Sequence, residues 1–334
     1  MHVGKSYGAL EFLAWSRRKA FILLLISLVP VLAHTAFRLD VGIVPWSVIL
    51  LLGTTVALVA GFKNTSIYNR SVEAQQIWSA ISTSSRLWGA LACELPATCN
   101  PKGLVYHHLA WLTALRFALR SPRPWETAGH KANAEYRKRY RVLEQETTLQ
   151  AELAKYLAAA QVDLILKAAN PATRLLYLQS EALKALLDAG TLSGQSYGEL
   201  LRTLRDLHDQ QARCERIKNN PYPRQYAVVS ALFVGIFCIL LPFGLIGPFA
   251  ELGTQADSLL KRHTVWLVVP VSVLIGWMYT ALDQVGEATA NPFEGNANDV
   301  PITQISRSIE IELRELLGER DLPPVLEPVN GIAT

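Results

Sequence analysis

A short loop near the end of the chain carries the residue types of a cation site. Residues 291–299 read Asn-Pro-Phe-Glu-Gly-Asn-Ala-Asn-Asp, and they place oxygen-bearing side chains around a glycine directly after the last long hydrophobic run. Closely spaced oxygen ligands are what Ca²⁺ and similar hard cations prefer. Several positions where a calcium loop would carry carboxylates hold Asn or Ala instead. The loop therefore has the form of a cation site without its charge.

Other groupings that could carry chemistry are weak. His107 and His108 are adjacent, so a helix would point them about 100° apart, which does not suit a shared metal. Cys93 and Cys99 lack the second pair of a zinc module. The sequence contains no phosphate loop or zinc-protease motif. The basic residues in 131–141 are interrupted by Glu135 and followed by Glu144, which favours a solvated face over a lipid or nucleic-acid patch. We expect no enzyme, no cofactor and no nucleic-acid partner.

The composition indicates a membrane protein. Half of the 334 residues are hydrophobic and only 18% are charged, below the level usual for soluble chains. Four long stretches contain no Asp, Glu, Lys or Arg, and each is long enough to cross the hydrocarbon core of a bilayer. These stretches are residues 20–37, 41–62, 225–250 and 264–282. They predict four transmembrane helices.

Basic residues near the span ends predict the orientation, because cytoplasmic ends carry more Lys and Arg. Three of these ends are basic, whereas the two predicted hairpins show no such excess. The residues concerned are Arg17, Arg18 and Lys19 before the first span, Lys63 and Arg70 after the second, and Lys218 and Arg224 before the third. We therefore expect both termini and the long middle segment to face the cytoplasm.

The middle segment is too long for a loop without structure. Its apolar residues recur at helical spacing, and we see no strand pattern. The predicted helices are 71–95, 102–119, 130–169, 172–189 and 192–218. The predicted fold is all-α, with four membrane helices continuous with a cytoplasmic helical bundle. The predicted divisions are an N-terminal segment 1–19, spans 20–62, a cytoplasmic domain 63–223, spans 224–285, a loop and helix 286–318, and a tail 319–334 that could be flexible.

The second span carries a stripe with one member per helical turn. Thr54, Leu58 and Phe62 lie on one face, and Phe62 stands at the cytoplasmic end. In a single four-helix subunit such a stripe is simply packing. Around an axis shared by several copies, it would form a hydrophobic constriction that can gate by dewetting. The spacing alone favours packing over a pore.

Three segments together resemble the bestrophin family, in particular its bacterial branch. They are Gly-Phe-Lys-Asn-Thr-Ser-Ile-Tyr-Asn-Arg-Ser-Val-Glu-Ala at 61–74, Cys-Glu-Arg-Ile-Lys-Asn-Asn-Pro-Tyr-Pro-Arg-Gln-Tyr at 214–226, and the loop beginning Asn-Pro-Phe at 291–301, followed by Ile-Glu-Ile-Glu-Leu at 309–313. The resemblance covers about residues 5–318. It implies a pentameric ion channel, with subunits of four membrane helices arranged in a ring around one central pore.

The resemblance also implies roles for particular residues. The hydrophobic neck of the family falls on Thr54, Leu58 and Phe62, and the first position departs from the family by being Thr, which puts gating and selectivity at that level in doubt. A cytoplasmic aperture falls loosely on Leu192, with Ser196 and Tyr197 as neighbours. Just below the neck, polar side chains would face permeating ions: Asn64, Thr65 and Asn69.

The calcium-activated relatives bind Ca²⁺ in the loop after the fourth span. Its positions fall on Asn291, Asn296 and Asp299, of which only Asp299 keeps a carboxylate, and Glu294 is the one nearby replacement. Neutral ligands bind Ca²⁺ more weakly. We therefore expect a structural turn with its Ca²⁺ positions empty, and no calcium control.

The resulting prediction is a homopentameric channel for small monovalent ions, embedded in membrane lipids, with an inclination to Cl⁻. A channel of the same fold selective for Na⁺ or K⁺ is the first alternative, and a non-conducting membrane scaffold or receptor is the second. Lys63 and Arg70 favour anions only if they face the lumen, and Arg70 could instead pair with Glu73.

Overall fold

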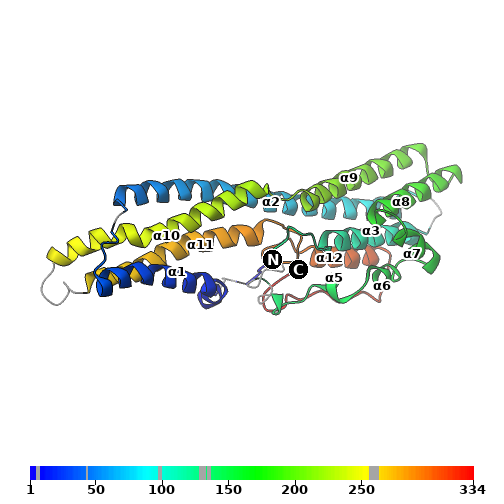
Figure 1. The fold of residues 1–334 in the computed structure, drawn as a ribbon. Coiled ribbons are helices and arrows are strands. Elements are labelled where there is room, and N and C mark those ends of the chain that lie inside the picture. Colours follow the sequence, from blue (N-terminus) through cyan, green and yellow to red (C-terminus); the bar gives the residue numbers. More distant parts are fainter. Residues whose placement is uncertain (5–7, 43, 97–99, 128–132, 134–136, 256–262) are drawn as a thin grey trace. The chain divides into compact units, whose positions relative to one another are not determined.

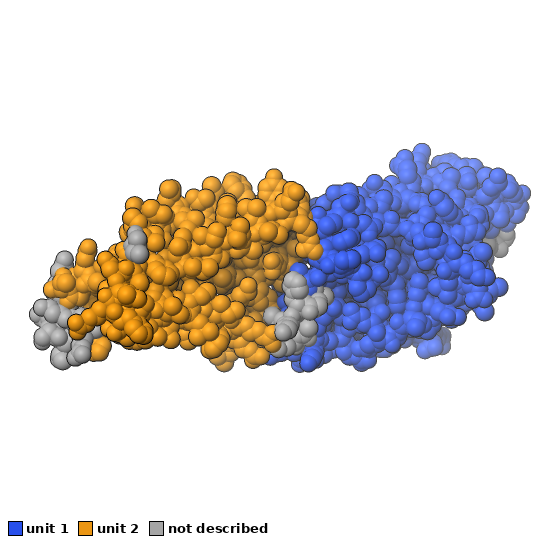
Figure 2. Space-filling view, viewed as in Figure 1, with its two compact units in different colours: residues 1–5, 70–221, 291–334 blue, residues 6–69, 222–290 orange. Residues whose placement is uncertain are grey.

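The computed structural model describes residues 1–4, 8–42, 44–96, 100–127, 133, 137–255 and 263–334. The secondary structure of these residues is helical apart from two isolated bridges, His2 to Ile332 and Val329 to Ile332 (Figure 1). The prediction of an all-α fold is therefore confirmed. The chain forms two compact units, one from residues 6–69 and 222–290 and the other from residues 1–5, 70–221 and 291–334, which Figure 2 colours separately.

The first of these units holds the membrane helices. Within the described residues, four helices are long and apolar enough to cross a bilayer, as the sequence predicts. Helices α1 and α10 both pack against α11, and a short 3₁₀ helix, η1, leads into α11 (Figure 1). The elements are α1 (Ala9–Phe37), the first part of α2 (Trp46–Glu94), α10 (Arg224–Gln255), η1 (Thr264–Leu267) and α11 (Val268–Thr289). We refer to this part of the chain as the membrane unit.

Helix α2 is a single uninterrupted helix of 49 residues. The sequence predicts a span and a separate helix 71–95 here, whereas the structure joins them without a break. No proline lies between Pro45 and Pro96, and these two residues bound the helix because proline favours the first turn and disfavours helix in the residue before it. The membrane span and the helix predicted over 71–95 are therefore the same element.

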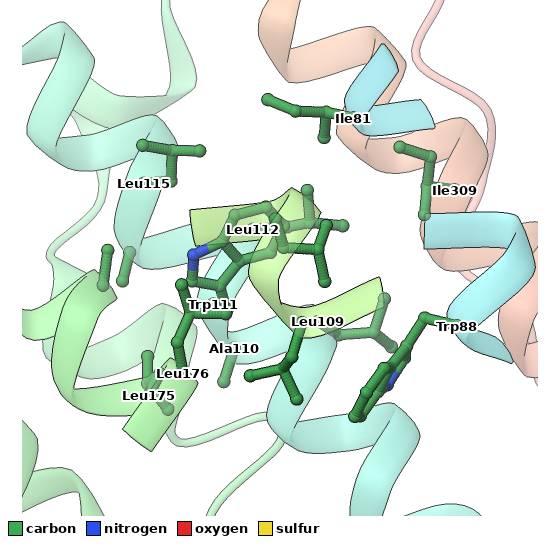
Figure 3. Close-up of a cluster of buried hydrophobic side chains, with 14 of the residues drawn as sticks. Ile81, Trp88, Leu109, Ala110, Trp111, Leu112, Leu115, Leu175, Leu176 and Ile309 are labelled. Atoms are coloured by element: carbon green, nitrogen blue, oxygen red, sulfur yellow. The ribbon is translucent and has the colours of Figure 1, made fainter. Parts of the chain in front are cut away.

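The other unit, which we call the helical unit, is built around a large apolar core. Its helices are α3 (Lys102–Arg120), α5 (Leu143–Glu146), α6 (Leu149–Leu153), α7 (Ala159–Leu166), α8 (Pro171–Asp188), α9 (Gly194–Asn219) and α12 (Ile302–Leu316). Trp111 and its neighbours on α3 pack between α8, α12 and the later part of α2 (Figure 3). Trp78, Trp88 and Trp111 are fully buried. Burial of such large rings is a major stabilising contribution.

The predicted helix 130–169 is wrong in its described part. Three short helices, α5 to α7, occupy it, and Val142 has an extended backbone (φ −121°, ψ 101°). The break lets Glu144 turn inward, where its carboxylate meets Arg116 at 3.2 Å. Much of the basic segment 131–141, and Cys99, lie outside the described residues. Cys93, Cys214 and Cys238 are free thiols.

The last residues of the chain are held by hydrogen bonds. The carbonyl oxygen of Thr334 accepts from the N–H groups of Thr303 and Gln304, both at 3.1 Å, at the start of α12. Ile332 and Ala333 are buried. The tail thus satisfies donors that the first turn of a helix leaves open.

Candidate functional site

One face of α2 is exposed along the membrane unit. Thr54, Leu58 and Phe62 all lie on it, and the side chains of Leu58 and Phe62 are 60% and 67% exposed. The opposite face packs inward through Val56, Ala60, Lys63 and Ile67. A helical period of 3.6 residues separates these two sets cleanly. The three predicted neck residues therefore share one accessible stripe, which no other described part of the chain covers.

The threonine in this stripe is less polar than its type suggests. The hydroxyl of Thr54 donates to the carbonyl oxygen of Leu51 on its own helix, at 2.9 Å. A threonine bonded in this way turns its hydroxyl toward the backbone. Its methyl group is then the part that continues the apolar surface of Leu58 and Phe62.

The back of α2 is fixed to α11 at two heights. Near the middle of the span, the hydroxyl of Tyr279 donates to the carbonyl oxygen of Gly53 at 3.2 Å. Next to Phe62, the ammonium group of Lys63 pairs with the carboxylate of Asp283 at 2.6 Å. The side chain of Lys63 is 3% exposed and that of Asp283 is 13% exposed. These contacts set which face of α2 remains accessible.

The polar residues below Phe62 divide into two groups. Thr65 and Asn69 lie on the exposed stripe, in line with Leu58 and Phe62. Asn64 lies off it, because its amide donates to the carbonyl oxygen of Leu282 on α11 at 3.4 Å. The structure thus brings Thr65 and Asn69 together with the neck residues and separates Asn64 from them.

The basic residues at this end of α2 are engaged inside their own units. Lys63 is bound to Asp283 as described, and Arg70 donates to the carbonyl oxygen of Ile217. The alternative partner for Arg70, Glu73, forms an ion pair with Arg216. Lys63 would favour anions only if its ammonium group faced a lumen. In this structure the ammonium group is buried against Asp283 instead.

The residues predicted for the aperture occupy different environments. Leu192 is 3% exposed and belongs to the core of the helical unit. Ser196 is half-buried, and its N–H is bonded to the hydroxyl of Ser193, the N-cap of α9. Tyr197 packs against the core. Of the three, Ser196 has the most accessible surroundings.

The loop 291–299 belongs to the helical unit and is a second, separate candidate. Asn291, Asn296 and Asp299 are all buried there, together with Glu294. Burial raises the pKa of Asp299 to about 7, an effect increased by Glu294 and opposed by the guanidinium of Arg120. No group of three or more His, Cys, Asp or Glu side chains in the described residues is arranged to hold a metal.

Sequence reasoning missed the partners of both candidates. Asp283 directly follows the last charge-free run. An ionisable residue at the end of a membrane span needs an oppositely charged partner, so its position alone predicts that such a partner exists. Nothing local identifies Lys63 as that partner, since 220 positions separate the two. Arg120, at the end of α3, carries no local sign that it will reach Asp299.

The fold and the exposed stripe together define a class of protein. It is a helical protein with four candidate membrane spans in its described part, and the second span exposes a face that is apolar along the span and polar beyond it. Residues 15–315 match the profile described as Bacterial/Fungal Bestrophin protein. Because that match covers most of the chain, this protein belongs to the bacterial and fungal bestrophin family.

Individual relatives agree with this assignment. The chain is 28% identical to the "Voltage-dependent anion channel-forming protein YneE" of Salmonella typhi, over 87% of this chain and 82% of the relative. It is 26% identical to the protein of the same name from Escherichia coli (strain K12), over 92% and 87%. A crystal structure of a bacterial bestrophin homologue from Klebsiella pneumoniae has 25% identity and a TM-score of 0.73, covering 91% of this chain and 98% of that one. Neither the family nor these names indicates an enzyme.

Proposed function

We propose that this chain is the subunit of a homopentameric ion channel in a bacterial inner membrane, with both termini in the cytoplasm. Small monovalent ions would pass by electrodiffusion through a neck formed by Thr54, Leu58 and Phe62 of each subunit. The observation that carries the proposal is the accessible stripe on α2, whose opposite face is buried and anchored to α11. Rotation of several copies about one axis would turn these stripes toward each other.

The residues that continue the stripe favour a water-filled path as its environment; they do not favour a surface that faces lipid alone. Thr65 and Asn69 extend it with polar side chains that remain exposed. Polar side chains near a span are most often found facing a protein interior or a water-filled cavity. The sequence of apolar neck followed by polar exit fits an ion path.

Anions are the favoured permeant ions, because relatives with this length of match are named for anion channels. Chloride is the corresponding substrate. A channel selective for Na⁺ or K⁺ is the alternative, because the pairing of Lys63 with Asp283 removes one positive charge that would have favoured anions. Reversal potentials of the purified protein in a bilayer with a NaCl gradient distinguish the two, and a value near the sodium equilibrium potential would overturn the anion assignment.

A non-conducting scaffold or receptor is the second alternative, and paired substitutions test it. We expect Leu58→Ala with Phe62→Ala to raise single-channel conductance by about twofold or more, because the hydrophobic constriction widens. The matched control is Leu25→Ala with Phe21→Ala on α1, which has the same residue types, the same spacing and exposed side chains.

A control pair that changes conductance as much as the neck pair would contradict the assignment of the neck. Absence of any conductance from a wild-type pentamer would favour the scaffold. A mass measurement of the detergent-solubilised protein tests the oligomer itself, and any number of subunits other than five would overturn that part of the proposal.

A further inference from the structure

The loop 291–299 presents its polar groups inward, toward side chains of the same unit. Both carboxylate oxygens of Glu294 accept from the N–H of Thr127 at 3.1 Å, and one of them accepts from the amide of Asn296 at 2.9 Å. The amide of Asn291 donates to the same carboxylate. Glu294 is thereby saturated by donors of the protein, and both Asn side chains turn an N–H₂ group toward it. These three residues are not arranged as oxygen ligands for an external cation.

Asp299 closes the loop on itself. One of its oxygens accepts from the N–H groups of Gly295 and Asn296, at 2.7 and 2.9 Å. Its other oxygen has no hydrogen-bond donor among the described residues. A buried carboxylate with one unsatisfied oxygen requires a nearby positive charge.

Arginine side chains supply positive charge at this place. The guanidinium of Arg120 lies 4.0 Å from Asp299 and 3.8 Å from Glu144, and the side chains of all three are 1% exposed. Within the described part of the chain, none of the three guanidinium nitrogens of Arg120 has a hydrogen-bond acceptor. Arg137 donates to the carbonyl oxygen of Glu294 at 2.8 Å. A Cβ atom on Gly295 would stand 3.1 Å from Arg137 and 3.3 Å from Arg120, so both guanidinium groups lie directly against the loop.

When all three carboxyl groups are ionised, the side-chain charges of this group balance without an added ion. Arg116, Arg120 and Arg137 oppose Glu144, Glu294 and Asp299, three side chains of each sign. Arginine stays protonated in proteins, so burial does not remove its charge. A divalent cation would enter next to a permanent positive charge and find only one carboxylate oxygen of the loop open. The residues present therefore do not fit Ca²⁺.

We infer that Arg120 is the resident cation of the loop 291–299, and that its guanidinium holds the turn closed in the place where an external divalent cation would otherwise be needed. The loop is thus permanently in its closed form and does not respond to calcium. This inference concerns the loop alone and stands apart from ion conduction.

The test uses full-length protein in detergent and CaCl₂ as the probe. The thermal midpoint of the wild-type protein should not change with millimolar calcium. Arg120→Ala removes the charge and leaves its space open, so its midpoint should fall, and calcium should then raise it by about 3 °C through binding to the folded state only. Arg120→Lys keeps a positive charge and should remain unresponsive to calcium.

Arg116→Ala is the matched control, since Arg116 is buried in the same group but pairs with Glu144 and not with the loop. It should lower the midpoint without any calcium response. Equal calcium responses in the Arg116 and Arg120 variants would overturn the inference, as would calcium binding to the wild type or a folded Arg120→Ala that ignores calcium. If Arg120→Ala does not fold, Arg120→Gln, which removes the charge and keeps more of the side-chain volume, and calorimetric titration of the wild type with calcium supply the decision: calcium must stabilise the former and must not bind the latter.

Discussion

The ion pair between Lys63 and Asp283 allows a double-substitution experiment on the source of selectivity. Lys63 lies on the face of α2 opposite the exposed stripe, so its ammonium group stands about one helix diameter, roughly 10 Å, from an ion beside Phe62. With its partner intact the pair is electrically neutral. Asp283→Asn leaves an unpaired positive charge and Lys63→Met leaves an unpaired negative charge at the same position.

The expected shift follows from Coulomb's law. One unpaired charge at about 10 Å and an effective dielectric constant of roughly 30 changes the energy of Cl⁻ by about 1 kcal/mol and that of Na⁺ by about 1 kcal/mol in the opposite direction, so the permeability ratio changes by roughly 30-fold. Starting from an unselective pore, this corresponds to about 50 mV of reversal potential in a tenfold NaCl gradient. Asp283→Asn should move the reversal potential toward chloride, and Lys63→Met toward sodium. The double variant should return to the wild-type value.

Stability gives an independent measurement on the same proteins. Breaking a buried pair on one side costs about 3–5 kcal/mol, whereas removing both partners costs much less. The thermal midpoint of the double variant should therefore exceed that of either single variant. If the double variant instead shares the reversal potential of Lys63→Met, then Lys63 itself faces the ion path, and the reasoning from its burial is refuted.

Two further predictions concern the helical unit. His108 is fully buried between Trp88 and Trp111, and burial lowers its pKa to about 3. The neutral, buried imidazole therefore contributes fully to the free energy of unfolding above its ordinary pKa of 6.5, and this contribution is lost as the pH falls toward 3. In denaturant titrations the wild type should lose about 2 kcal/mol between pH 7.5 and 5 relative to His108→Phe, and equal losses would contradict this. Gly295 has φ +85°, and a Cβ atom there would lie close to Arg137 and Arg120, whereas Gly190 has φ +71° and open space around the position of a Cβ atom. Gly295→Ala should therefore lower the free energy of unfolding by clearly more than the roughly 1 kcal/mol expected for Gly190→Ala. Similar values for both would disprove the crowding at Gly295.

The sequence predicts the membrane helices and the stripe well because both are local properties. The thickness of a bilayer converts directly into a number of uncharged residues, so each span is visible without knowing its neighbours. The positions of Thr54, Leu58 and Phe62 follow from one helical period, and their common exposure is a consequence of that period alone. The burial of Ala60 on the other face follows in the same way.

The remaining features depend on partners distant in the chain. Lys63 at a span end predicts orientation from the sequence, but only the packing of α2 on α11 shows that its charge is neutralised. Leu192 precedes a helix, and nothing at that position states whether it faces a core or an opening. The helix predicted over 130–169 is replaced in its described part by short helices, and the contact of buried Glu144 with the distant Arg116 is not visible in the local sequence.

The exposed stripe on α2 also has a genetic consequence. In the proposed pentamer every ring takes one stripe from each of five chains, and a single altered stripe changes the whole constriction. When wild-type and altered chains are present in equal amounts and mix at random, only about one ring in 32 contains no altered copy. Substitutions at Leu58 or Phe62 should therefore act dominantly in a cell that also carries the normal gene, whereas substitutions that only prevent folding should act recessively.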